Sequence, residues 1–72
     1  MNLIFTCSSH KDFDRFKLII NKSKYYADSI NYEFKSLRFH CQDQNDADSL
    51  EPKIQELADK NDISGYFELE EK

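Results

Sequence analysis

The order of apolar and polar positions along the chain predicts a strand at each end. Residues 2–8 contain three consecutive apolar side chains, which is typical of a central strand whose two faces are both covered at least in part. Residues 63–70 alternate between apolar positions and a polar row that ends in Glu68 and Glu70. We expect this last strand to be half-buried with one acidic face, which would protect a sheet edge against unwanted pairing.

A helix is predicted directly after the first strand. Phe13, Phe16 and Ile20 recur at helical spacing, so one face of the segment is apolar. Ser9 and Asp12 can cap its amino-terminal end, because the Ser9 oxygen accepts a hydrogen bond from a backbone amide that lacks a helical partner. The pattern does not fix where this helix ends.

The segment after this helix is open to two interpretations. Either the helix continues to Ile30, or it stops near residues 21–23 and residues 23–27 form a short, lysine-bearing edge strand. In the second case residues 28–31 are predicted to form a turn. Residues 32–41 then form a strand whose apolar parity shifts near its middle, through a bulge or through burial of both faces at different depths.

A second helix is predicted near the carboxy-terminal end of the chain, over residues 49–60. Ser49 is its expected N-cap, and Pro52 falls in the first turn, where the missing amide costs nothing. Residues 42–48 are polar and acidic, and we expect them to form a loop. The apolar face of the helix consists of Leu50, Ile54, Leu57 and Ala58.

Two α+β arrangements fit these elements. With the short strand at residues 23–27, the order is β-α-β-β-α-β, which predicts a ferredoxin-like fold with a four-stranded antiparallel sheet and two helices on one face. Without that strand, the order is β-α-β-α-β, with a mostly parallel three-stranded sheet. We favour the first, because the 18 residues from Lys24 to Cys41 can hold a hairpin and are many for one strand and a connection.

Length and composition limit the chain to one domain, residues 1–72. Of its 72 residues, 39% are hydrophobic and 33% are charged, which suits a small soluble globule. No apolar run approaches the roughly 18 residues of a membrane span, and no export signal is evident, so we expect a cytoplasmic protein with reduced thiols. A domain of this size has marginal stability, and a partner or a homodimer is a natural supplement.

The net charge of −4 is distributed unevenly. Residues 1–36 hold six basic and four acidic groups, whereas residues 37–72 hold four basic and ten acidic groups. An acidic chain repels phosphate backbones, so nucleic acid is disfavoured and a protein with a basic surface is the better partner. The same acidic half would also serve as a solvated face that aids solubility. The acidic residues expected at an interface are Asp43, Asp46, Asp48, Glu51, Glu68 and Glu70.

The sequence gives little indication of a metal site or a catalytic site. Cys7, His10, His40 and Cys41 are its zinc-type ligands. In the antiparallel fold Cys7 and Cys41 end strands at opposite edges of the sheet, and neighbours such as His40 and Cys41 project to opposite faces of a strand. One glycine, Gly65, cannot form a phosphate-binding loop, and a catalytic thiol would need oxyanion donors that are not evident. We therefore expect no metal, no cofactor and no enzyme activity.

The uncovered face of the predicted sheet is the expected binding surface. Aromatic side chains beside charged groups are typical of protein interfaces. We therefore expect a protein-binding module that regulates or inhibits a larger, nucleic-acid-processing protein, similar in size and charge to small phage or mobile-element inhibitors. The alternative function is binding of single-stranded RNA, with bases stacked on the same face. The residues that share one parity on the predicted third strand are Tyr32, Phe34, Arg38 and His40.

Overall fold

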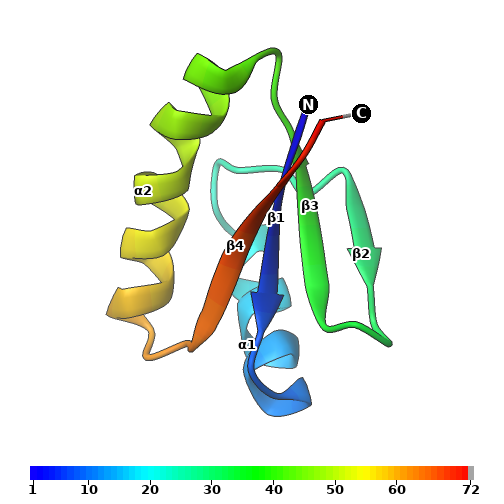
Figure 1. Ribbon diagram of the computed structural model, residues 1–72. Helices are drawn as coiled ribbons and strands as arrows, with labels where there is room; N and C mark the ends of the chain where they lie inside the picture. The colour runs from blue at the N-terminus through cyan, green and yellow to red at the C-terminus, as the bar shows by residue number, and fades with distance from the viewer. Residues whose placement is uncertain (72) are drawn as a thin grey trace.

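The computed structural model describes residues 1–71, which contain four strands and two helices. In chain order the elements are β1 (Asn2–Cys7), α1 (His10–Asn21), β2 (Ser29–Asn31), β3 (Ser36–His40), α2 (Gln44–Lys60) and β4 (Gly65–Glu70). The strands form one sheet in the order β2-β3-β1-β4, and every pair of neighbours is antiparallel. Both helices lie on the same face of this sheet (Figure 1).

This topology confirms the predicted α+β class, with a four-stranded antiparallel sheet and two helices, and it is consistent with a ferredoxin-like fold. β1 and β2 run parallel with β3 between them, and β3 and β4 run parallel with β1 between them. The mostly parallel, three-stranded alternative is wrong, because no neighbouring strands among the described residues are parallel. β4 lies at an edge of the sheet, as its acidic alternation predicts.

The hydrophobic core lies between the sheet and the two helices. Leu3, Phe5 and Cys7 of β1 are buried, and Leu37 and Phe39 of β3 are buried beside them. Burial of one large apolar side chain stabilises a fold by about 1.5–3 kcal/mol, so the apolar stripes decide which face of each helix meets the sheet. The helices contribute Phe13, Phe16 and Ile20 from α1 and Ala47, Ile54 and Ala58 from α2.

Helix α1 begins where the sequence predicts and ends at Asn21. The Ser9 hydroxyl oxygen accepts a hydrogen bond from the Asp12 amide at 3.1 Å. Beyond Asn21 the Ile20 carbonyl oxygen accepts hydrogen bonds from both the Ser23 amide, at 3.0 Å, and the Ser23 hydroxyl, at 2.8 Å. The amide bond spans three residues rather than four, so the chain leaves the α-helical pattern here. The longer version of this helix is therefore wrong.

The hairpin before β3 is present but lies several residues later than predicted. Residues 23–27 form a connection, and β2 occupies positions that the sequence predicts as a turn. The Asn31 side-chain oxygen accepts a hydrogen bond from the Phe34 amide at 3.0 Å, and Lys35 has a positive φ of 58°, so the chain turns here. Tyr32 and Phe34 therefore lie in a turn, and the predicted bulge is wrong, because the parity changes where the turn meets β3.

Helix α2 begins earlier than predicted, at Gln44. The Asp43 carboxylate accepts a hydrogen bond from the Asp46 amide at 2.9 Å, and the Asp46 carboxylate accepts one from the Gln42 amide at 2.9 Å. These reciprocal bonds give two backbone amides a hydrogen-bond acceptor. The predicted loop over residues 42–48 is therefore wrong, because most of this segment forms the start of the helix. Pro52 consequently lies inside α2, where it cannot donate the usual backbone hydrogen bond.

Candidate functional site

The face of the sheet that points away from the helices carries four of the predicted binding residues. Arg38 and His40 of β3 alternate with buried residues and therefore lie on this face. Arg38 and Glu68 both lie opposite Ile4, from the two strands that flank β1. Glu70 is two residues beyond Glu68 and shares its face. The structure thus brings these four charged or polar side chains to one open surface.

Arg38 is held by acidic neighbours on this surface. Its guanidinium lies 3.2 Å from the Asp28 carboxylate and 3.8 Å from the Glu70 carboxylate. The Asn2 side-chain amide donates a hydrogen bond to the Glu70 carboxylate at 2.9 Å. Each half-exposed ion pair contributes at most about 1 kcal/mol to stability. The pairs nevertheless neutralise Arg38, so the surface does not present a free cation at this position.

Tyr32 and Phe34 do not belong to this surface, and the prediction that they share a face with Arg38 and His40 is wrong. The turn places the Tyr32 ring against α1, 4.8 Å from the His10 ring and 5.7 Å from the Phe13 ring, measured between ring centroids. The His10 Nε2 atom donates a hydrogen bond to the Tyr32 carbonyl oxygen at 3.1 Å. Both Tyr32 and Phe34 are exposed, so they remain available to a partner on another side of the molecule.

The predicted acidic residues of the polar segment all lie in the first two turns of α2 or at its cap. Asp43 and Asp46 form the cap, and the Asp48 carboxylate accepts a hydrogen bond from the Gln44 side chain at 2.8 Å. Glu51 is partly buried on the same helix. Because α2 lies on the other face of the sheet from Glu68 and Glu70, these residues do not form a single flat patch with them.

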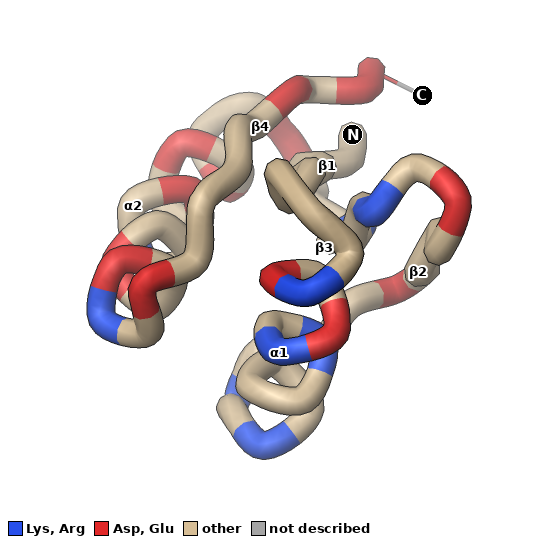
Figure 2. Tube along the Cα trace, turned by 90° about the horizontal axis from the view of Figure 1, so that it is seen from below, with Lys and Arg blue, Asp and Glu red and all other residues tan. Residues whose placement is uncertain are grey.

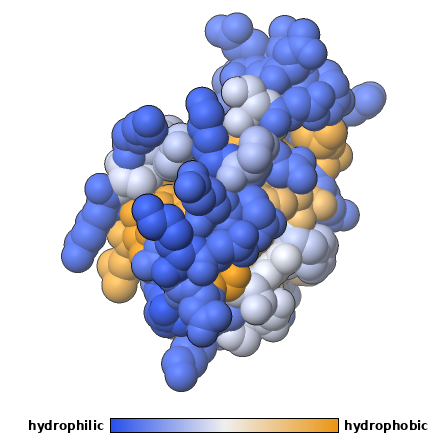
Figure 3. Space-filling model, turned by 90° about the vertical axis from the view of Figure 1, so that its left-hand side faces the viewer, coloured by the Kyte–Doolittle hydropathy of each residue, from blue (hydrophilic) through white to orange (hydrophobic). Residues whose placement is uncertain are grey.

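Charge is nevertheless separated across the molecule (Figure 2). Residues 43–71, which include α2, β4 and the segments beside them, carry ten acidic and two basic side chains, whereas residues 10–24, which include α1, carry five basic and two acidic ones. We call the side formed by α2 and β4 the acidic flank. The side of the molecule that carries α2 is predominantly hydrophilic (Figure 3). This flank therefore offers charge to a partner and little apolar area.

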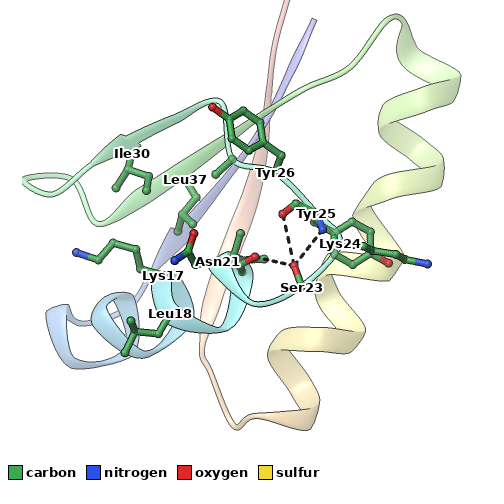
Figure 4. Close-up of a pocket in the computed structure, with 11 residues that line it drawn as sticks. Lys17, Leu18, Asn21, Ser23, Lys24, Tyr25, Tyr26, Ile30 and Leu37 are labelled. Atoms are coloured by element: carbon green, nitrogen blue, oxygen red, sulfur yellow. Dashed lines mark hydrogen bonds between the residues drawn. The ribbon is translucent and has the colours of Figure 1, made fainter.

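A groove of about 630 Å³ lies between α1, the connection over residues 22–28, and β2 (Figure 4). Its sides carry Leu18, Tyr26 and Ile30, whose side chains are 61%, 80% and 48% exposed. The buried Leu37 lies at its floor. We call this feature the α1–β2 groove. Its volume is in the range of pockets that bind small molecules or the side chains of a peptide.

The sequence predictions did not include this groove, although three of its apolar residues stand out in the sequence. Leu18 falls outside the apolar stripe of α1, and Ile30 stands alone among polar residues. Tyr26 follows another tyrosine, in a segment that forms neither a helix nor a strand in the structure. Three large apolar side chains without a place in the core indicate a surface cluster. The groove could be located only once the course of residues 22–31 was known.

The two thiols are buried at opposite ends of the sheet, as the antiparallel order predicts. The Cys7 amide donates to the Lys35 carbonyl oxygen, and the Cys41 amide donates to the Met1 carbonyl oxygen. Burial, reinforced by the nearby Asp12 carboxylate, raises the pKa of Cys7 to about 11. Burial is also the main cause that raises the pKa of Cys41. Both thiols therefore stay protonated near neutral pH, which makes them poor nucleophiles.

Among residues 1–71, no three histidine, cysteine or acidic side chains are arranged to hold a metal ion. The described helices are also too short or too polar to cross a membrane. Comparison of the chain with models of protein families, with curated protein sequences and with solved structures gives no match. The function must therefore be inferred from the surfaces described above.

Proposed function

We propose that this chain is a small, non-enzymatic protein-binding module that regulates or inhibits a larger protein through its acidic flank. The complementary partner surface is basic. Proteins that process nucleic acids carry such surfaces, because they neutralise phosphates with lysine and arginine. Burial raises the pKa of the Cys7 thiol to about 11, which makes this residue a poor nucleophile. We place this activity in the cytoplasm, where both thiols would stay reduced.

The separation of charge carries this proposal. Ten acidic side chains against two basic ones over residues 43–71, which include α2 and β4, create a negative potential on one side of a molecule whose longest dimension is 30 Å. Complementary potentials steer encounter and select partners more than they add affinity. A module that depends on them would bind quickly and reject acidic surfaces, as expected of a regulator that competes for a basic site.

Single-stranded RNA fits the open sheet face less well than a protein does. Among the described residues of its strands, this face carries two ring side chains, Tyr66 and His40, beside Glu68 and Glu70. RNA-binding sheets stack bases on two or three aromatic rings and need cations for the phosphates. Arg38 is already paired with Asp28 and Glu70, so a phosphate would have to displace a carboxylate.

The fold proposed with this function is ferredoxin-like in its finer description. Each helix connects two parallel strands that have one further strand between them, which is the split β-α-β arrangement. This arrangement leaves one face of the sheet free of helices. One face of β4 is therefore exposed, and it carries Glu68 and Glu70 of the acidic flank.

The test uses a tagged copy to capture its partner from the native host, followed by measurement of the dissociation constant of the purified pair. The informative variant combines Asp48→Asn, Glu51→Gln, Glu56→Gln and Glu68→Gln, and it leaves the helix-capping residues Asp43 and Asp46 intact. Because rim charges each contribute a fraction of a kcal/mol, we expect this variant to bind about tenfold more weakly. Raising the salt concentration should weaken the wild-type complex in the same direction.

The matched control removes the same kind of charge elsewhere. Asp14 on α1 and Glu33 in the turn before β3 are exposed acidic residues outside the acidic flank. The double variant Asp14→Asn and Glu33→Gln should change the dissociation constant by less than about twofold. A complex that survives high salt and the four substitutions unchanged would exclude the acidic flank as the binding surface.

A further inference from the structure

We propose that the α1–β2 groove binds an extended acidic peptide segment of a partner protein, and that this segment lies along the free edge of β2. This site is distinct from the acidic flank. It has the opposite charge and uses different elements. The inference therefore goes beyond the proposed function, and the two can fail separately.

Most of the large exposed apolar side chains of the molecule lie in the stretch of chain that builds the groove and the turn after it. Seven large apolar or aromatic side chains are exposed among the described residues, and five of them lie between residues 18 and 34. Three of the five line the groove. Clustered exposed apolar side chains are typical of binding sites, whereas isolated ones are normal on any surface. The five residues are Leu18, Tyr26, Ile30, Tyr32 and Phe34.

The charge of the groove indicates an acidic occupant. Its lining includes Lys17 and Lys24 and no acidic residue. The two lysine side chains point away from each other (Figure 4), and the Lys24 ammonium lies 5.7 Å from the centroid of the Tyr25 ring. The Lys17 ammonium lies 5.4 Å from the centroid of the Phe13 ring, which holds it close to the helix. A peptide with carboxylates at its two ends and apolar side chains between them matches this distribution of charge.

The groove follows an edge of the sheet, which indicates that the occupant is extended. β2 pairs with β3 on one side and ends the sheet on the other, and all three of its residues are exposed. Ile30, the middle residue of β2, lines the groove. A strand added beside β2 would direct every second side chain toward the same face as Ile30 and therefore into the groove. The side-chain amide of Asn21 lies in the groove and offers a further polar contact (Figure 4).

The direct test is titration with a labelled ten-residue peptide that carries glutamates at both ends and, between them, leucine or phenylalanine alternating with threonine. Binding is followed by fluorescence anisotropy, and the site is mapped by amide chemical shifts. We expect saturable binding, with shifts at Leu18, Asn21, Tyr26 and Ile30. The variant Tyr26→Ala should weaken binding about tenfold, because truncation of a central aromatic anchor removes most of its contact. Lys17→Gln should also weaken it, and the effect should shrink at high salt.

The matched control is Tyr66→Ala, which truncates a comparably exposed tyrosine on the open face of β4. It should change the affinity by less than about twofold. Because Tyr26 is 80% exposed, its replacement should leave the fold intact, and an unchanged thermal midpoint verifies this.

Four results would overturn the inference. The first is equal binding of a peptide in which lysine replaces glutamate, and the second is unchanged affinity in Tyr26→Ala. The third is the absence of binding at about 1 mM peptide, where even a contact worth about 4 kcal/mol would be detected. The fourth is concentration-dependent self-association that Tyr26→Ala abolishes, because the occupant would then be a second copy of this chain. Loss of peptide binding would leave the acidic flank untouched, and neutralisation of the flank should leave peptide binding intact.

Discussion

At the scale of single residues, Gly65 is a glycine because a side chain would lack room there, and not because of its backbone conformation. A Cβ atom at this position would lie 2.6 Å from Phe5 Cζ and closer still to the Thr6 carbonyl oxygen. The φ angle of Gly65 is not in the left-handed region, so any residue could adopt its backbone conformation. The close approach of β4 to β1 therefore accounts for the residue.

We expect Gly65→Ala to destabilise the protein. The substitution restricts the unfolded chain, which alone would stabilise by about 0.4–1 kcal/mol. Overpacking against Phe5 and backbone costs about 1–3 kcal/mol, so the steric effect prevails. Urea unfolding followed by circular dichroism measures the difference, and Ser64→Ala at the exposed neighbouring position is the control. An increase in stability would show that β4 and β1 are not so closely packed.

At the scale of secondary structure, local hydrogen bonds explain where the sequence predictions were right and where they were wrong. The first strand, α1 and β4 were predictable, because apolar periodicity and burial agree there. The start of α2 and the turn that ends β2 were not, because they depend on the side chains of Asp43 and Asn31. Asparagine and aspartate bond to nearby backbone in caps and turns alike, so the same residues favour a loop and a helix start.

The start of α2 can be tested by comparing two candidate caps. Asp43→Ala removes the acceptor of the Asp46 amide, so we expect it to lower the free energy of unfolding by about 1 kcal/mol. Ser49→Ala changes an exposed position inside the helix and should alter stability by less than about 0.5 kcal/mol. Thermal or urea unfolding of both variants distinguishes the two starts. If Ser49→Ala destabilised the protein more than Asp43→Ala, Ser49 rather than Asp43 would be the N-cap of α2.

The candidate surfaces were predictable only in part, for the same reason. Side chains alternate between the two faces of a strand, so the shared face could be predicted wherever the predicted strand is present in the structure. The residues that share this face are Arg38, His40, Glu68 and Glu70. Tyr32 and the α1–β2 groove were beyond sequence reasoning, because a displaced turn moves side chains to another side of the molecule. Errors of a few residues in one hairpin thus changed the predicted site more than the predicted fold.

At the scale of the whole molecule, charge organises the two proposed surfaces. The molecule measures 30 × 24 × 19 Å, whereas charges in physiological salt are screened within about 8 Å. The acidic flank and the α1–β2 groove, whose lining includes Lys17 and Lys24, can therefore attract different partners with little mutual interference. A basic surface on the flank and an acidic segment in the groove could be held at the same time, which would make this small domain an adaptor.

The most direct measurement of the central claim is zero-length cross-linking of the complex with carbodiimide, which joins a carboxylate to a lysine in contact with it. Mass spectrometry then identifies the joined residues. Binding through the acidic flank predicts cross-links from Asp48, Glu56 and Glu68 to lysines of the partner. Cross-links confined to Asp14 and Glu33, or only from lysines of this chain to carboxylates of the partner, would contradict it.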